Sequence, residues 1–113
     1  MIGIQSPPVD ILEEYDKYVV FIDLPGVKPE DIKIYGDEKS ITVEGIRNIH
    51  HSRKFIHIER FSGKFIKKLV FKEFINLSQA QALLENGVLT IEIPKARNEF
   101  IIDTQIIKII VRR

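Results

Sequence analysis

The alternation of apolar and polar residues along the chain predicts a series of short β-strands. The clearest pattern lies in residues 82–95, ALLENGVLTIEIPK, where the two kinds of residue alternate from Leu89 onward. Period-two alternation favours a half-buried strand. Asn86-Gly87 supplies the positive φ angles of a tight turn before it. Pro94 ends the strand because it has no N–H to donate to a neighbouring strand.

Similar patterns recur with turns between them about every eight to twelve residues, which is typical of a β-sandwich. Residues 76–84 are ambiguous, because Ala, Gln and Leu favour a helix whereas the flanking strands favour extended structure, the preferred interpretation. The other strands are expected over residues 9–14, 18–24, 32–35, 41–44, 55–60 and 65–71, with a single helical turn over 28–31. Gly45 is expected to close the strand over 41–44.

In the strand over 18–24, Val20, Ile22 and Leu24 should face the core, and Val19, Phe21 and Asp23 should face the other side. The nearly continuous apolarity of this strand predicts that it is buried on more than one side.

The last segment is rich in isoleucine although it follows all the strands of the expected sandwich. Left unpaired, a segment this apolar is an aggregation hazard, so it should dock somewhere. Ile107-Lys108-Ile109 places two isoleucines on one side of an extended chain, as in peptides that add to a sheet edge. Docking onto a partner is the preferred interpretation, and a final strand within the same chain is the alternative. The six isoleucines are Ile101, Ile102, Ile106, Ile107, Ile109 and Ile110.

Length and composition indicate one compact domain over residues 9–95, between a short lead (1–8) and a C-terminal extension (96–113). Seventeen Lys and Arg against sixteen Asp and Glu leave a net charge of +1, so neither nucleic acid nor a membrane is an expected partner. The chain has no cysteine, and residues 1–4 are too short for the apolar region of a signal peptide. The expected location is the cytoplasm.

No pattern of catalytic residues is visible, and the glycines do not cluster into a phosphate-binding loop. We therefore expect neither enzyme activity nor a cofactor. The three histidines, His50, His51 and His57, match no familiar set of metal ligands, and solvated positions are preferred over a metal site. Lys64, Lys67 and Lys68 beside Phe65 are interpreted as a solvated strand face rather than a nucleic-acid strip.

Four segments match one known family in order and spacing. They are Pro8-Val9-Asp10-Ile11 with Glu13; Leu24-Pro25-Gly26-Val27 with Asp31-Ile32; His57-Ile58-Glu59-Arg60 with Ser62-Gly63-Lys64-Phe65; and Ala82 with Asn86-Gly87-Val88-Leu89 and Pro94-Lys95. In these segments the chain resembles the small heat shock proteins, whose common part is the α-crystallin domain. The resemblance implies an immunoglobulin-like β-sandwich of the non-animal type, with a strand-swap loop.

The resemblance also implies how subunits would assemble. Ile107-Lys108-Ile109 looks like the family's Ile-x-Ile motif, which docks into a groove between two edge strands of a neighbouring subunit. By position, that groove would be lined by Ile32, Ile34, Leu77 and Leu83. The excursion over 48–58 resembles a loop exchanged between two subunits. In the resulting strand-swapped dimer, Phe55, Ile56, His57, Ile58, Glu59 and Arg60 would meet the partner's Val9, Ile11 and Leu12; ordinary core positions are the alternative for Phe55, Ile56 and Ile58.

The chain departs from the family in two respects. Its lead is shorter than the family's usual apolar arm, which indicates either a minimal member or a shortened form. Lys67, Lys68 and Val70 stand where members often have arginine, and Lys72 where proline is common, which disfavours an arginine-dependent dimer salt bridge. The expected function is that of an ATP-independent holdase chaperone that binds unfolding client proteins and forms homo-oligomers. A co-chaperone or adaptor that binds one folded partner is the alternative.

Overall fold

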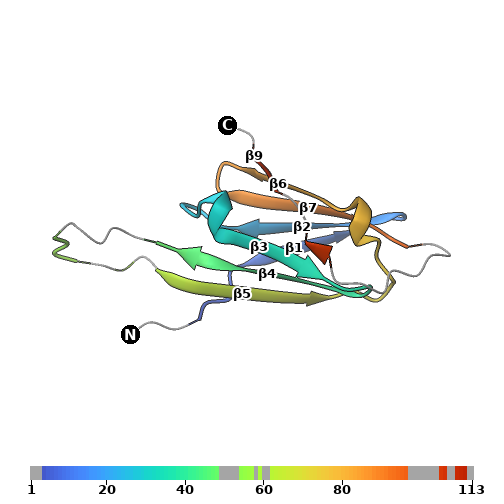
Figure 1. Cartoon of the computed structure of the whole chain (residues 1–113), viewed down its shortest axis with the longest axis horizontal. Coiled ribbons are helices and arrows are strands. Elements are labelled where there is room, and N and C mark those ends of the chain that lie inside the picture. The colour runs from blue at the N-terminus through green and yellow to red at the C-terminus, as the bar shows by residue number, and fades with distance from the viewer. Residues whose placement is uncertain are drawn as a thin grey trace.

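A computed structural model describes residues 4–48, 54–57, 59, 62–96, 105–106 and 109–111. Within these ranges the chain forms strands and two short 3-10 turns, arranged in two layers (Figure 1). The strands are β1 (Val9–Glu13), β2 (Lys17–Asp23), β3 (Ile32–Gly36), β4 (Ser40–Arg47), β5 (Gly63–Val70), β6 (Gln81–Glu85), β7 (Val88–Pro94), β8 (Gln105–Ile106) and β9 (Ile109–Val111), and the turns are η1 (Pro29–Asp31) and η2 (Leu77–Gln79).

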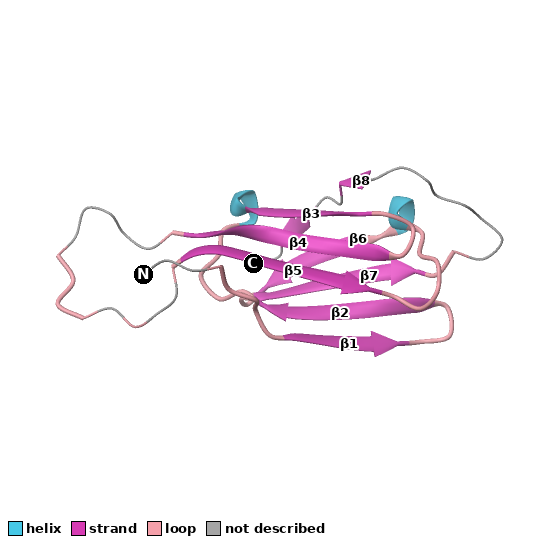
Figure 2. Cartoon of the chain, turned by 90° about the horizontal axis from the view of Figure 1, so that it is seen from below, coloured by secondary structure: helices cyan, strands magenta, loops and turns pink. Residues whose placement is uncertain are grey.

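The strands form two sheets that lie face to face (Figure 2). One sheet has the order β1-β2-β7-β6-β9, and the other has the order β5-β4-β3-β8. Neighbouring strands are antiparallel except for β6 and β9, which run parallel. The predicted all-β sandwich is therefore confirmed.

The core lies between the sheets and is built from alternate residues of each strand. In β2, Val20 and Ile22 have no exposed surface, whereas Phe21 on the other face is 37% exposed. The predicted core face of this strand is thus confirmed. Val19 is only 6% exposed although it faces away from the core, as the nearly continuous apolarity of the strand predicts. The largest fully buried side chains are Val20, Ile22, Ile34, Ile41, Val43, Ile75, Leu89, Ile91 and Ile93.

The prediction that Gly45 closes a strand is wrong, because β4 continues through it to Arg47. Gly45 lies opposite Phe65 in the register of β4 and β5. A Cβ atom at this position would overlap the Phe65 ring and the carbonyl oxygen of Asp31. The glycine therefore serves close packing inside a strand, and does not mark its end.

The ambiguous segment 76–84 contains a single 3-10 turn, η2, followed by β6. The helix alternative is therefore limited to one turn, and the preferred extended structure begins at Gln81. Asn86 (φ 53°) and Gly87 (φ 76°) then form the predicted tight turn between β6 and β7. Positive φ at both central residues is the geometry that suits a two-residue hairpin loop.

Replacing Ile91 by Ala should lower the free energy of unfolding by about 2–5 kcal/mol, because the change leaves a cavity at a fully buried position of β7. Urea denaturation at a fixed protomer concentration measures the difference. Thr90→Ala on the opposite face is the control and should change stability by no more than about 0.5 kcal/mol. Equal losses in the two variants would contradict the assignment of faces in β7.

Candidate interaction edges

The first candidate site is the side of β1, the end strand of the larger sheet, on which no strand of the described residues pairs. Ile11 is 46% exposed and Leu12 is 49% exposed. Ile11 lies opposite the buried Val20 and so belongs to the inner side of the sheet. It is nevertheless exposed, because β1 extends beyond the edge of the facing sheet, where β5 is the end strand (Figure 2). An unpaired strand edge with apolar side chains is a place where another extended chain can add.

The second candidate site is the side of the sandwich where β3 and β6 run. On β3, Ile32 is 9% exposed and Ile34 has no exposed surface, so both side chains belong to the core cluster. On β6, Ala82 and Leu84 alternate toward the same interior. The period-two rule applied to residues 81–85 assigns both side chains to the core face.

The other two predicted groove residues lie elsewhere. Leu77 is 3% exposed in η2 and belongs to the core cluster. Leu83 is half-buried and faces away from the core, opposite Thr90 of β7. The structure therefore brings Ile32 and Ile34 together with Ala82 and Leu84, and it places Leu83 on the outer face of β6.

The C-terminal extension lies along these same two strands within one chain. β8 pairs with β3, so that Ile106 is opposite Tyr35, and β9 pairs with β6, so that Ile109 is opposite Ala82. Ile107 lies outside the described residues. The extension thus reaches both sheets on the side where the sequence placed the docking groove. The pairing shown is that of the alternative interpretation, a final strand within the same chain.

The excursion between β4 and β5 forms no strand in its described residues, 54–57 and 59, although the sequence predicted one over 55–60. Ile56 is 94% exposed and Phe55 is 40% exposed. His57 and Glu59 are also exposed, with His57 Nε2 3.4 Å from Glu59 Oε2. Ile58 and Arg60 lie outside the described residues. The described apolar side chains of the excursion therefore do not enter the core of their own chain.

Lys95 connects three segments at the point where the C-terminal extension leaves the sandwich. Its Nζ lies 2.8 Å from Oε2 of Glu13 in β1 and 2.7 Å from Oε2 of Glu73, which follows β5. The same Nζ lies 5.0 Å from the centre of the Tyr18 ring. Hydrogen bonds to Glu13 and then Glu73 raise the pKa of Lys95 to about 12. The side chain therefore stays charged although it is only 7% exposed.

Backbone contacts hold the same region. The Lys95 N–H donates to the carbonyl oxygen of Asp16, and the Ala96 N–H donates to that of Phe74, each at 2.8 Å. The start of the extension is thus fixed relative to β1 and to the segment after β5. Sequence reasoning used Lys95 for the resemblance and as the end of the domain, and it missed this role because the carboxylate partners are remote in the sequence.

The described residues offer no site for metal chemistry, since no three His, Asp or Glu side chains among them converge. His50 and His51 lie outside these residues. No helix in the described ranges is long and apolar enough to cross a membrane. What the described part of the chain does present is backbone and apolar side chains at strand edges. These features define a β-sandwich whose candidate sites are surfaces for other polypeptide segments.

Comparison with known proteins identifies the particular family. Residues 10–110 match the model of the Hsp20/alpha crystallin family, and the chain belongs to that family. It is 35% identical over 94 residues to an 18.1 kDa class I heat shock protein of Medicago sativa, with 80% of this chain and 66% of that protein covered. It is 36% identical over 94 residues to an 18.5 kDa class I heat shock protein of Glycine max, with 80% and 58% covered. The chain thus spans less than two thirds of these relatives.

Solved structures show the same fold. Heat shock protein 16.0 from Schizosaccharomyces pombe superposes with a TM-score of 0.75 at 28% identity, covering 86% of this chain and 71% of that one. A small heat-shock protein from Xylella fastidiosa, described as having a distinct high order structure, gives 0.74 at 32% identity, covering 86% and 92%. The resemblance inferred from the sequence is confirmed.

The charge of Lys95 should make stability depend on pH in the alkaline range. Its pKa is about 12 in the folded chain and 10.5 ordinarily, so the folded state binds this proton more tightly. The stabilisation is therefore complete below pH 10.5 and is lost as the pH rises through 12. Urea titrations of the native chain and of Lys95→Met should show a stability difference that shrinks across this window.

The matched control is Lys64→Met, because Lys64 is exposed and forms no ion pair within the described residues. Its stability curve should run parallel to that of the native chain. If the Lys95→Met curve also runs parallel, Lys95 does not hold the three segments together through its charge.

Proposed function

We propose that this chain is an ATP-independent holdase chaperone, which binds non-native proteins and prevents their aggregation during heat or other stress. In this proposal it is not an enzyme, and it acts in the cytoplasm on exposed apolar segments. Membership of the Hsp20/alpha crystallin family supports the chaperone class. The observation that carries the proposal is the presence of apolar side chains beside open strand edges, of which Ile11 and Leu12 on β1 are the clearest.

Strand edges suit this task because their main recognition element is the backbone. An extended segment of any sequence can supply N–H and C=O groups to an edge, and apolar side chains add affinity wherever they alternate correctly. Burying one isoleucine contributes about 1.5–3 kcal/mol. Ordering the bound segment offsets part of this gain, so that binding is weak and reversible. Low selectivity with reversible binding is what a holdase requires.

The assembly that we propose begins with a strand-swapped dimer. Residues 55–60 of one chain would pair with Val9, Ile11 and Leu12 of the partner. Two observations support this pairing. The free side of β1 presents exposed Ile11 and Leu12, and the described residues of the excursion keep Phe55 and Ile56 out of their own core. Each chain thus presents an edge of β1 that no described strand covers, and apolar side chains of the excursion that lie outside its own core.

Larger homo-oligomers would form when the C-terminal extension exchanges from its own chain to a neighbour. Ile107 and Ile109 would then dock beside Ile32 and Ile34 of the neighbouring chain. Pairing of β9 with β6 within one chain supports the fit of this segment to that edge. The backbone pairing of β9 with β6 can form within one chain or between chains, so effective concentration decides between the two arrangements. A single extension favours its own chain, whereas several extensions acting together favour an assembly.

The chaperone proposal predicts that the protein suppresses the heat aggregation of an unfolding client at near-stoichiometric ratios without nucleotide. Light scattering of a thermolabile enzyme follows the effect, with an equal mass of an inert protein as the control. If scattering is unchanged while the chain forms a complex of fixed stoichiometry with one folded partner, the holdase proposal is wrong and the adaptor function takes its place.

Exchange of the extension can be tested by disulfide formation, because the chain contains no cysteine. Leu83 and Ile110 are register partners between β6 and β9, which suits a disulfide. When chains carrying Leu83→Cys are mixed with chains carrying Ile110→Cys, only exchange between chains can join them. We expect a cross-linked dimer on non-reducing gels, and Leu83→Cys mixed with Asp103→Cys should give much less of it.

If the mixture stays monomeric while the double variant closes its own disulfide, the extension does not dock on neighbours. Size measurement by light scattering gives a second readout. Replacing Ile107 and Ile109 by Gly should reduce the oligomer, whereas replacing Asn98 and Asp103 by Gly should not, since the second pair adds equal flexibility without removing apolar side chains.

A further inference from the structure

The free side of β5 is covered at one position by the beginning of the chain. Gln5 forms a parallel bridge with Phe65. Its N–H donates to the carbonyl oxygen of Lys64 (3.1 Å), and its own carbonyl accepts from the N–H of Ile66 (3.0 Å). A segment of the chain itself therefore shows that this edge accepts an extended backbone in parallel orientation.

Proline stops this pairing after one residue. In a parallel ladder, the next hydrogen bond would run from residue 7 to the carbonyl oxygen of Ile66, but Pro7 has no N–H. The N–H and C=O groups of Lys68 and Val70 face the same side as those of Ile66, because they lie two and four residues further along β5. No backbone hydrogen bond from another described segment reaches them on this side. The edge is therefore longer than the segment that covers it.

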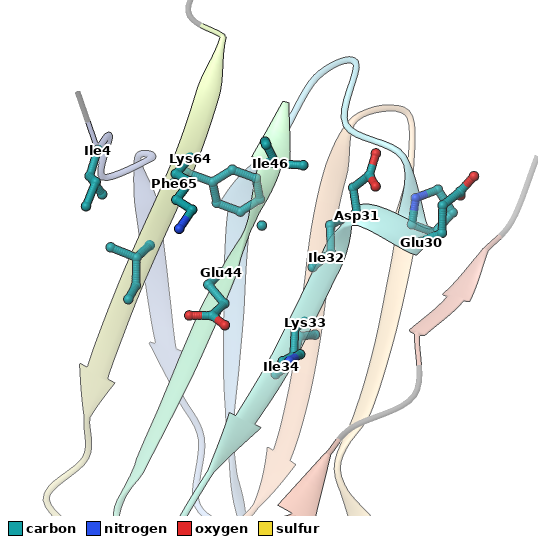
Figure 3. A pocket seen from close by; sticks show the side chains of 13 residues that line it. Ile4, Glu30, Asp31, Ile32, Lys33, Ile34, Glu44, Ile46, Lys64 and Phe65 are labelled. Carbon is teal, nitrogen blue, oxygen red and sulfur yellow. The ribbon is translucent and has the colours of Figure 1, made fainter. Parts of the chain in front are cut away.

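A cavity of about 880 Å³ adjoins this edge and extends over β5, β4 and β3 (Figure 3). Ile4, Ile46 and Ile66 supply apolar parts of its lining. Ile4, next to the bridging Gln5, is 68% exposed, and Ile66 is 42% exposed. A segment paired with β5 would therefore have an apolar surface beside it for its own side chains.

The charge of β5 indicates what such a segment should carry. Lys64, Lys67 and Lys68 lie on this strand, and none forms an ion pair with a carboxylate of the described residues. Lys67 Nζ instead donates to the hydroxyl of Ser6 at 3.0 Å. Acidic side chains that lie along β5 would therefore complement its lysines, whereas the carboxylates Glu30, Asp31 and Glu44 line the cavity farther from the edge, beside β3 and β4.

We propose that the free edge of β5 and the adjoining cavity form a second binding site for extended apolar segments with acidic flanks, taken from unfolding proteins. The segment at Gln5 occupies this site weakly and competes with the bound segment. This inference rests on the proposed chaperone function and specifies one of its client sites. It also gives the beginning of the chain a role, namely to hold the edge closed until a segment without proline replaces it.

Two substitutions should shift this competition in opposite directions. Gln5→Pro removes the N–H that donates to Lys64, so the chain's own cover weakens and peptide affinity should rise about two- to tenfold. Pro7→Ala restores the missing donor, so the cover extends and affinity should fall by a similar factor. Gln5→Ala is the matched control, because it keeps both backbone hydrogen bonds and should leave affinity unchanged.

The probe is a short synthetic peptide with valine and isoleucine between aspartates, followed by fluorescence anisotropy. The same peptide with lysine in place of aspartate should bind more weakly. Amide hydrogen exchange by NMR locates the site. We expect the peptide to protect the N–H groups of Lys68 and Val70, which the chain's own cover does not reach.

Three results would overturn the proposal: equal affinity in all variants, no detectable peptide binding, or binding that leaves Lys68 and Val70 unprotected. If protection of these two N–H groups rises with protein concentration in the absence of peptide, a second copy of the chain occupies the edge. This result would also overturn the proposal. Client light scattering separates this failure from that of the chaperone function. If aggregation is still suppressed, only the β5 site is lost; if it is not, the proposed function fails as well.

Discussion

An open β-sandwich must deal with the unpaired backbone groups of its end strands, and this constraint organises the chain. On one side, β8 covers β3 and β9 covers β6. On the other side, β1 has no strand beyond it in the described residues, and Gln5 covers β5 at a single position. The core between the sheets is closed, so every proposed interaction lies at an edge. The edges differ in how completely the chain itself covers them.

Local sequence patterns predicted much of the fold. The predictions failed where one sequence feature can arise from either of two physical causes. Period-two alternation placed Val20 and Ile22 correctly, and Asn86-Gly87 gave the correct turn. Gly45 was misassigned, because a glycine that ends a strand and a glycine that makes room for an aromatic ring look alike in a sequence. For residues 76–84, helix propensity was overridden by the neighbouring strands, and only one turn of η2 remains.

Sequence patterns could not predict the contacts between segments that are distant along the chain. The carboxylate partners of Lys95 and the bridge at Gln5 depend on which segments the fold brings together, and no local pattern encodes them. The docking of the C-terminal extension is a different case. The isoleucines indicated an edge-binding segment, but identical chains present identical edges. Whether the extension stays on its own chain or moves to another therefore depends on the protein concentration and on how the extension is tethered. The pattern of residues does not determine this balance.

The separation of core and edges allows binding without unfolding. Removing a single fully buried side chain such as Ile91 costs about 2–5 kcal/mol, and the core contains many such residues. An edge contact contributes a few kcal/mol at most, and the ordering of the added segment offsets part of it. Edges therefore open at much lower free energy than the sandwich itself. Lys95 fixes the base of the extension to β1 and to the segment after β5 through two carboxylates, and these contacts do not involve β9 or β6. Edge strands can thus exchange partners while the two sheets remain intact.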